Sequence, residues 1–245
     1  MATKAVIHIT DNSLPEPLAS YCREVLVKEA GDIEIISVSQ KPITLGKNIC
    51  VGETGRNWLS IYKQQLAGAE ATDADYVGIC EHDCLYTHEH LAWIPPTDDT
   101  FYYNHNCWLL QLASNHPELK GMYSYIPRRY ALSQLVCNRK LLIESLKERL
   151  DLLQGGFVLA KGMAGAGEFG VKDRVALAQR MARNGSHRQT GDLIRNELTV
   201  RKARSFATVN PNVDIRHDSN FTGARRGKKR CYELPYWGKF KWLQQ

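Results

Sequence analysis

The chain has 245 residues and a formal net charge of +6, and 43% of its residues are hydrophobic and 24% charged. These values indicate one large domain with a packed core and exclude a disordered or fibrous chain. No run approaches about 18 apolar residues, which excludes a membrane span. The N-terminus lacks the apolar stretch of a signal peptide and the seven cysteines show no C-x-x-C spacing, so we expect a cytoplasmic protein with free thiols.

Charge is distributed unevenly along the chain. Residues 1–171 contain 15 Lys and Arg against 20 Asp and Glu, a net charge of −5, whereas residues 172–245 contain 17 against 6, a net charge of +11. Such a step is typical of a basic surface for a polyanion attached to a near-neutral or acidic scaffold. A solvated basic surface without a dedicated partner would have the same signature.

The first 80 residues alternate between strand patterns and helix patterns. Strands are predicted at 4–10, 33–38 and 76–80, and helices at about 15–30, with Pro15 and Pro17 in the first turn, and at 56–69. This alternation indicates an α/β fold with an open, mostly parallel sheet and right-handed crossovers. Ligands bind at the carboxyl ends of the strands in such sheets, so the loops that begin at Thr10, Ser39 and Glu81 are candidate binding loops.

The rest of the chain is less regular. Strands are predicted at 101–104, 107–112 and 213–217, and helices at 139–153 and 172–184. The Gly- and Ala-rich segment 155–170 is interpreted as a mobile loop or linker.

The sharpest motif is Glu81-His82-Asp83, directly after the apolar strand YVGIC. Strand alternation places Glu81 and Asp83 on one side and His82 on the other. Two carboxylates at the carboxyl edge of a sheet suit Mg²⁺ or Mn²⁺ bound together with substrate phosphates, and such a cation would neutralise a leaving diphosphate. A capped turn with two solvated carboxylates is the structural alternative.

The elements of residues 4–90, followed by this acidic motif, resemble those of GT-A-fold glycosyltransferases, in which a nucleotide-binding βαβαβ unit ends in Asp-x-Asp. Glu81 departs from that motif but keeps its charge. The resemblance implies transfer of a hexosyl or pentosyl group from a UDP-sugar with the help of Mn²⁺ or Mg²⁺. It implies that residues 1–112 form the nucleotide-sugar-binding half and that residues 113–245 form a basic, mixed α/β acceptor-side part continuous with the same domain.

The resemblance also assigns donor and metal residues. The donor residues would be Thr10, Asp11 and Asn12 after the first strand, Gly55, Arg56 and Asn57 before the second helix, and Glu81. Arg56 would pair with a phosphate, although arginine is also ordinary at a helix start. Many members complete the metal site with a late histidine, which implies His217 together with Glu81 and Asp83. Asp214 and Asp218 are weaker candidates in the same segment.

An inverting enzyme of this kind also needs a carboxylate base near the acceptor hydroxyl. Glu168, in the Gly-rich segment, is the first candidate and Asp173 the second. A Gly-rich loop could instead be only a hinge, and a retaining enzyme would need no such base.

A dense basic cluster near the C-terminus suggests the acceptor. Its members are Arg225, Arg226, Lys228, Lys229 and Arg230. Such clusters bind phosphate backbones largely without sequence preference. The aromatic residues Tyr232, Tyr236, Trp237 and Trp242 would stack on bases or, alternatively, dock the C-terminal tail onto the core.

A small sugar transferase with a basic acceptor half is similar to the phage enzymes that glycosylate hydroxymethylated pyrimidines in DNA. This likeness implies a double-stranded DNA acceptor, base flipping and the host cytoplasm as location.

Three other functions compete with this one. The same transferase could act on a saccharide or lipid carrier. A metal-dependent phosphohydrolase is suggested by His82-Asp83 with His88 and His90, which superficially resemble the HD motif, although that family is helical around its metal. A non-enzymatic nucleic-acid binder would leave the acidic motif unexplained.

Overall fold

The computed structural model describes residues 2–127, 130–154, 168–170, 201–220, 227 and 229–240. The helices and strands found there, in chain order, are β1 (Lys4–Thr10), α1 (Leu18–Ala30), β2 (Glu34–Ser39), β3 (Lys47–Cys50), α2 (Trp58–Glu70), β4 (Tyr76–Glu81), β5 (Cys84–Leu85), α3 (His88–Ala92), β6 (Thr100–Asn104), β7 (Cys107–Gln111), β8 (Tyr123–Tyr125), β9 (Leu135–Asn138), α4 (Arg139–Gln154), β10 (Lys202–Phe206), β11 (Asn212–Arg216), β12 (Lys229–Cys231), β13 (Glu233–Leu234) and β14 (Gly238–Lys239), with 3₁₀ turns at Pro117–Leu119 and Leu132–Gln134.

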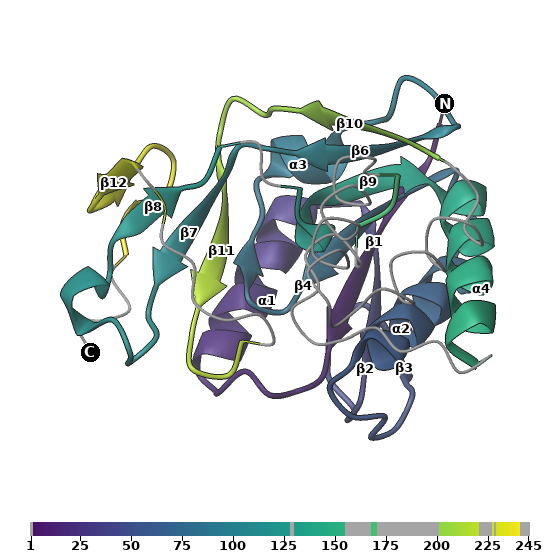
Figure 1. Cartoon of the computed structure of the whole chain (residues 1–245), viewed down its shortest axis with the longest axis horizontal. Helices are drawn as coiled ribbons and strands as arrows, with labels where there is room; N and C mark the ends of the chain where they lie inside the picture. Colours follow the sequence, from purple (N-terminus) through teal and green to yellow (C-terminus); the bar gives the residue numbers. More distant parts are fainter. Residues whose placement is uncertain are drawn as a thin grey trace, which may run out of the picture.

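A seven-stranded sheet forms the centre of the molecule (Figure 1), with the strand order β10-β6-β9-β4-β1-β2-β3. β1 pairs in parallel with β2 and β4, β2 pairs in parallel with β3, and β10 pairs in parallel with β6. Only β9 runs antiparallel to its neighbours β4 and β6. The α/β class and the mostly parallel sheet are therefore as predicted, and they are consistent with a GT-A-like arrangement.

A second sheet of five strands, in the order β12-β8-β7-β11-β5, extends away from the first (Figure 1). β9 and β10, which come from residues 113–245, belong to the central sheet, while β5 and β7, which come from residues 1–112, belong to the second sheet. The two parts of the chain are thus interleaved in space.

Most predicted elements are found close to their predicted bounds. β1 matches, and β4 and β7 differ from the prediction by one residue at one end. α2 begins at Trp58 because Asn57 caps it, with its side chain accepting a hydrogen bond from the backbone N of Ser60 at 2.9 Å. None of the helices in the described ranges has the length and apolarity that a membrane crossing requires. The seven cysteines are free, as expected.

The prediction missed β3 and also gave no element at β5, α3, β8, β9, β10 or β12 to β14, and it is untested in another part of the chain. β3 lies between the strand predicted at 33–38 and the helix predicted at 56–69, where no element was predicted, because its sequence KNIC alternates too weakly to indicate a strand. The predicted helix at 172–184 and most of the Gly-rich segment, residues 155–167, lie outside the described residues.

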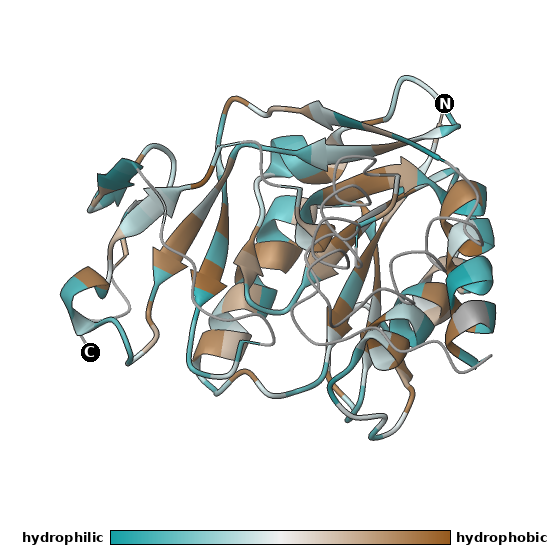
Figure 2. Ribbon diagram, viewed as in Figure 1, coloured by the Kyte–Doolittle hydropathy of each residue, from teal (hydrophilic) through white to brown (hydrophobic). Residues whose placement is uncertain are grey.

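Alternating side chains of β1 build the core on both faces of the central sheet. Ile7 and Ile9 point into the cluster formed with α2 and α4, whereas Val6 belongs to the cluster on the α1 side. The central strands are largely hydrophobic, while the outlying β12 is hydrophilic (Figure 2).

α2 lies close to the sheet at Gly68. A Cβ atom there would lie 2.4 Å from Ile7 Cγ2 and 3.2 Å from Val38 Cγ2. Gly68→Ala is therefore expected to lower the free energy of unfolding by about 3 kcal/mol, because two β-branched core residues would have to shift. Gly78→Ala in β4 is the matched control, since its Cβ would meet nothing closer than Lys4 Cε at 3.5 Å. Urea denaturation of both variants checks the prediction, and equal losses would contradict it.

The C-terminal tail packs against the body of the protein. The Tyr236 hydroxyl donates to Glu29 at 2.6 Å, the Trp237 indole N–H donates to the Pro211 carbonyl at 2.6 Å, and Phe240 contacts Tyr21 edge-on. These contacts favour the docking interpretation for Tyr236 and Trp237.

His90 is fully buried in an aromatic stack. Its ring lies between those of Tyr86 and Phe206, at centroid distances of 5.5 and 5.9 Å. Burial, with a smaller contribution from Lys4, lowers the pKa of His90 well below its ordinary value.

This depressed pKa predicts a dependence of stability on pH. The imidazole takes up a proton below about pH 6.5 in the unfolded chain only, so the free energy of unfolding should fall as the pH is lowered from there. His90→Gln should reduce the slope of the free energy of unfolding against pH by up to about 1.4 kcal/mol per pH unit. Urea denaturation of the wild type and of His90→Gln at several pH values between 6.5 and 5 measures this slope. Equal slopes for the two proteins would refute the prediction.

Candidate functional site

A pocket opens at the carboxyl ends of β1, β2 and β4, the edge of the sheet at which the sequence predicted a ligand site. It encloses about 1020 Å³ of space, its open mouth included. Its walls come from the ends of these strands, from the start of α2, from residues 130–133 and 168, and from the loop that follows β11.

The acidic motif reaches this pocket through a turn. β4 ends at Glu81, His82 and Asp83 form the turn, and β5 begins at Cys84. The predicted alternation, with His82 on the opposite side from the two carboxylates, is therefore wrong, because the strand ends before it could apply. All three residues line the pocket. The backbone N of Ile215 donates to the Asp83 carbonyl at 2.8 Å, which fastens the turn to β11.

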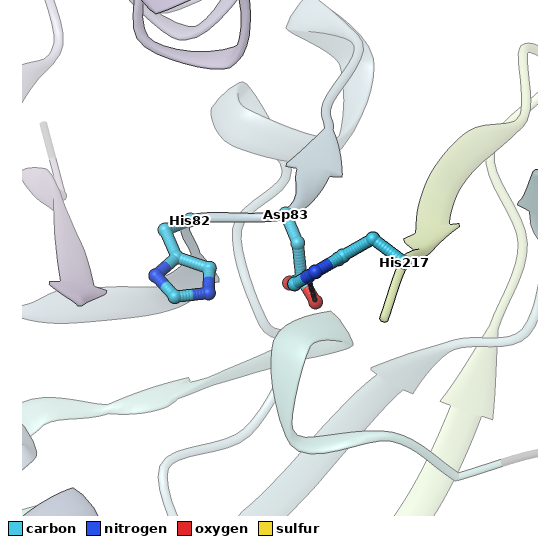
Figure 3. Close-up of side chains that lie close together, drawn as sticks. All are labelled: His82, Asp83 and His217. Carbon is cyan, nitrogen blue, oxygen red and sulfur yellow. Dashed lines mark ion pairs between the residues drawn. The ribbon is translucent and has the colours of Figure 1, made fainter. Parts of the chain in front are cut away.

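Asp83 lies at the centre of the polar groups on this side. His217 Nε2 is 3.4 Å from Asp83 Oδ2 (Figure 3), and Asn220 Nδ2 donates to the same oxygen at 2.7 Å. Burial by itself would raise the pKa of Asp83, but contact with His217 and the positive fields of His82 and Arg216 outweigh it, so the pKa lies well below its ordinary value. Asp83 is thus a carboxylate at neutral pH.

The side chains of His82, Asp83 and His217 form a candidate metal site, because one ligand atom of each lies within 4.8 Å of the others. His217 is 8% exposed, and neither of its ring nitrogens has a hydrogen-bond partner among the described residues. Glu81, Asp83 and Cys84 form a second group that shares Asp83. Imidazole and carboxylate donors together fit Mn²⁺ better than Mg²⁺.

His82 joins the acidic motif to the end of β1. Its Nδ1 lies 2.7 Å from the Thr10 hydroxyl and 3.6 Å from Asp11 Oδ1. Burial lowers the pKa of His82, and the neighbouring carboxylates of Asp83 and Asp11 offset this only in part. The imidazole is therefore neutral at pH 7, the form that binds metals.

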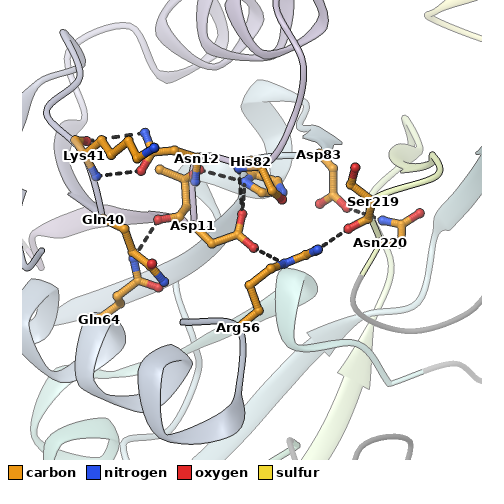
Figure 4. A network of polar contacts seen from close by, with 12 residues as sticks. Asp11, Asn12, Gln40, Lys41, Arg56, Gln64, His82, Asp83, Ser219 and Asn220 are labelled. Atoms are coloured by element: carbon orange, nitrogen blue, oxygen red, sulfur yellow. Dashed lines mark hydrogen bonds and ion pairs between the residues drawn. The ribbon is translucent and has the colours of Figure 1, made fainter. Parts of the chain in front are cut away.

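Arg56 connects two walls of the pocket (Figure 4). Its Nε lies 2.5 Å from Asp11 Oδ2, and its Nη2 donates to the Ser219 carbonyl. Burial would raise the pKa of Asp11, but hydrogen bonds from Ser13 and the charges of His82 and Arg56 lower it overall. The arginine predicted to meet a phosphate thus also ties the end of β1 to the loop after β11.

Two glutamines that sequence reasoning missed hold the floor of the pocket. Gln40 Nε2 donates to the Gly55 carbonyl at 2.7 Å, and Gln64 Nε2 donates to the Thr10 carbonyl at 2.7 Å (Figure 4). Gln40 directly follows Ser39, so the rule that ligands bind at strand ends could have found it. Gln64 has no such signal, because it lies in the middle of α2.

The predicted donor residues gather at the pocket with one exception. Those that line it are Thr10, Asp11, Gly55, Arg56, Asn57 and Glu81. Asn12 does not line it: its backbone has a φ of 58°, and its side-chain oxygen accepts a hydrogen bond from the Lys41 backbone N at 2.8 Å. Asn12 therefore joins the loops after β1 and β2.

The competing metal candidates have other partners. Asp214 pairs with Arg216 at 2.6 Å with both side chains 4% exposed, and Asp218 accepts hydrogen bonds from Ser114 at the surface. Of the three candidates Asp214, His217 and Asp218, His217 is the one that lies beside Asp83. His88 and His90 do not line the pocket, and His82-Asp83 lies in a turn after a strand, unlike a helical HD motif.

The remaining predicted residues are only partly described. Glu168 lines the pocket, whereas Asp173 lies outside the described residues. Lys229 and Arg230 are exposed in β12 and do not line the pocket. The other members of the basic cluster, Arg225, Arg226 and Lys228, lie outside the described residues, as does Trp242.

Comparison with known proteins gives similarity at the level of structure alone. No family model and no curated protein sequence matches the chain. Among solved structures, it is similar to a glycosyltransferase involved in the glycosylation of the major capsid of PBCV-1, with a TM-score of 0.44 and 9% identity over 86% of this chain and 93% of that one. It is also similar to Staphylococcus aureus TarS 1–349 in complex with UDP-GlcNAc, with a TM-score of 0.46 and 9% identity over 89% and 60%.

A third similar structure is the bifunctional IspDF of Campylobacter jejuni, with a TM-score of 0.38 and 10% identity over 84% of this chain and 50% of that one. The structures that resemble this chain thus include glycosyltransferases, but all three likenesses are distant. The function of the chain is therefore inferred from its pocket.

Proposed function

We propose that the chain is a metal-dependent glycosyltransferase that moves a sugar from a UDP-sugar to a hydroxyl group. The observation that carries the proposal is the contact of His217 with Asp83, a carboxylate that lines a pocket at the carboxyl edge of parallel strands. This is where α/β sheets bind nucleotides, and a cation bound by a carboxylate commonly shares its coordination with substrate phosphates.

The nucleotide is assigned to the side of the pocket formed by β1, β2 and α2. Asp11 offers carboxylate oxygens to the ribose hydroxyls, and Trp58 and Tyr130 supply aromatic surface for the base. Arg56 lies between this side and the cation side, where a guanidinium can meet the diphosphate.

Asp83 and His217 would hold the cation, with Glu81 and His82 as the nearest further donors. The Nδ1 atom of His217 fits this role, because it is buried without a hydrogen-bond partner among the described residues and such a group is costly unless a ligand completes it. When bound, a divalent cation supplies positive charge that stabilises the leaving diphosphate.

Glu168 is assigned to the acceptor hydroxyl, since it lines the same pocket as Asp83. The hydroxyl oxygen bonds to C1 of the sugar as the bond from C1 to the diphosphate breaks. The proton passes to the Glu168 carboxylate, and UDP leaves with the electron pair. A single displacement of this kind inverts the configuration at C1.

The acceptor we assign is a 5-hydroxymethylpyrimidine in duplex DNA. The net charge of +11 in residues 172–245 and the exposed Lys229 and Arg230 in β12 support a polyanionic partner. The base would have to leave the stack for its hydroxymethyl group to reach the pocket.

Calorimetric titration of UDP with and without Mn²⁺ tests the donor half. We expect Mn²⁺ to tighten UDP binding at least about tenfold, since the two ligands share one site. In His217→Gln this gain should shrink to less than about threefold, because a metal donor is lost. ADP serves as the nucleotide control. An absence of UDP binding in the presence of Mn²⁺ would overturn the donor assignment.

Incubation of UDP-sugars with DNA that contains 5-hydroxymethylcytosine or 5-hydroxymethyluracil tests the acceptor half. Nucleoside mass spectrometry should detect the glycosylated base. Transfer to saccharide or lipid-carrier acceptors alone would overturn the DNA assignment and keep the transferase. Hydrolysis of nucleotides without any transfer would overturn the transferase in favour of a phosphohydrolase.

A further inference from the structure

Glu168 belongs to a short segment, Glu168–Gly170, that is fastened to the core at every residue. Phe169 is 1% exposed and packs between Tyr62 and Phe101, at ring-centroid distances of 6.2 and 5.0 Å. A side chain buried this completely fixes the backbone on both sides of it.

The backbone of the same segment is bonded to a buried phenol. The Phe169 N–H donates to the Tyr103 hydroxyl at 2.6 Å, and that hydroxyl donates to the Phe169 carbonyl at 2.9 Å. Gly170 follows with a φ of 71°, and a Cβ atom there would lie 2.6 Å from the Lys202 carbonyl oxygen. Only glycine fits this close approach to β10.

Arg149 of α4 reaches this segment from the neighbouring helix layer, where α2 and α4 lie side by side (Figure 1). Its Nη2 donates to the Glu168 carbonyl at 3.1 Å, and its Nη1 donates to the Tyr62 hydroxyl at 2.7 Å. The guanidinium also lies 4.2 Å from the ring centroid of Phe169. One side chain thus holds the backbone of Glu168, the aromatic residue after it and α2 together.

The Glu168 carboxylate lies near the same group of residues. Burial is the main cause that raises the pKa of Tyr62, Arg149 opposes it, and the negative charge of Glu168 adds to the rise. Glu168 also contributes to the wall of the pocket.

We infer that Arg149 is a positioning residue, which holds Glu168 in the pocket through its contacts with the Glu168 carbonyl and the Phe169 ring. The consequence for turnover rests on the role proposed above for Glu168 in sugar transfer. The position of the segment itself does not depend on that role, so the two can be tested separately.

Hydrogen exchange of the intact chain, read by mass spectrometry on a peptide that covers residues 168–170, tests the position. In Arg149→Met, which keeps apolar volume and removes the donors, exchange should speed up about tenfold while β1 and β4 keep their protection. Lys147→Met is the matched control, because Lys147 lies in the same helix but pairs with Glu70 at the surface. Unchanged exchange in Arg149→Met would overturn the inference.

Turnover tests the consequence. Arg149→Met should lower kcat about tenfold and leave the KM for the UDP-sugar within about twofold, because the contacts of Arg149 described above are with Tyr62, Glu168 and Phe169, none of which is assigned to the nucleotide. In a Glu168→Gln background, Arg149→Met should lower kcat by less than about twofold, since the carboxylate that Arg149 positions is already absent. An equal fold decrease in kcat in the wild-type and Glu168→Gln backgrounds would show that Arg149 has a general structural role and would overturn the inference. If the wild type transfers no sugar at all, the proposed function fails while the exchange experiment still decides the position.

Discussion

Asp83→Asn is expected to lower kcat/KM for sugar transfer by on the order of 10³-fold, in a chain that remains folded. The substitution keeps the shape of the side chain and the acceptor oxygen for Asn220, but it removes the negative charge that His217, His82 and Arg216 surround. A neutral amide would bind a divalent cation far more weakly than a carboxylate.

Asp75→Asn provides the control for this prediction. Asp75 precedes β4 at its amino end, whereas Asp83 follows the strand at its carboxyl end, and it accepts hydrogen bonds from Thr3 at the surface. Its replacement should leave activity within about twofold, because ligands bind at the other end of the strand. Steady-state kinetics at saturating Mn²⁺, with circular dichroism of each variant, measures both. An Asp83→Asn enzyme that keeps a tenth of wild-type activity would contradict the assignment.

Glu168→Gln is expected to lower kcat by about 100-fold while the KM for the donor changes little. The loss follows from removing the group that takes the proton of the acceptor hydroxyl in the transition state. The KM for the donor should change little, because none of the contacts assigned to UDP is made by the Glu168 carboxylate.

Asp173→Asn is the matching variant, since Asp173 is the second candidate base. It should keep nearly full activity. The NMR spectrum of the initial product should show an inverted anomeric centre, as expected for one displacement. A large loss in Asp173→Asn with little effect of Glu168→Gln would move the base to residue 173, and retained configuration would remove the need for a base.

The parts of the fold that could be predicted are those in which local pattern and tertiary position agree. β1, β4 and α4 are continuous apolar or amphipathic runs, and burial on both faces of the sheet or on one face of a helix follows from that pattern. β3 and β10 are edge strands with exposed side chains, so their sequences carry little of this signal. Their pairing is decided by the backbone of the neighbouring strand.

The candidate site was predictable to a similar degree. The carboxyl ends of β1 and β4 follow from the strand pattern, so Thr10, Asp11, Glu81 and Asp83 were found. The turn geometry that brings His82 into the pocket could not be read from alternation, because alternation ends with the strand. Asn220 was missed as well, since its contact with Asp83 joins residues 137 positions apart in the sequence.

The division of charge along the chain does not divide the pocket. His217, Ser219 and Asn220 come from the basic part of the sequence, yet they contact Asp83 and Arg56 of the acidic part. The contacts around Asp83 and Arg56 are therefore built from both parts of the chain.

The insertion of β11 between β5 and β7 has a consequence for the order in which the protein matures during synthesis. The ribosome releases the N-terminal segments first, and long-range strand pairing is slow to form. β11 fastens the turn that carries Asp83 and leads into His217, so the two cannot meet until residue 217 has emerged. A nascent chain that has not yet been extended past His217 would thus lack the contact between Asp83 and His217 on which the candidate cation site depends.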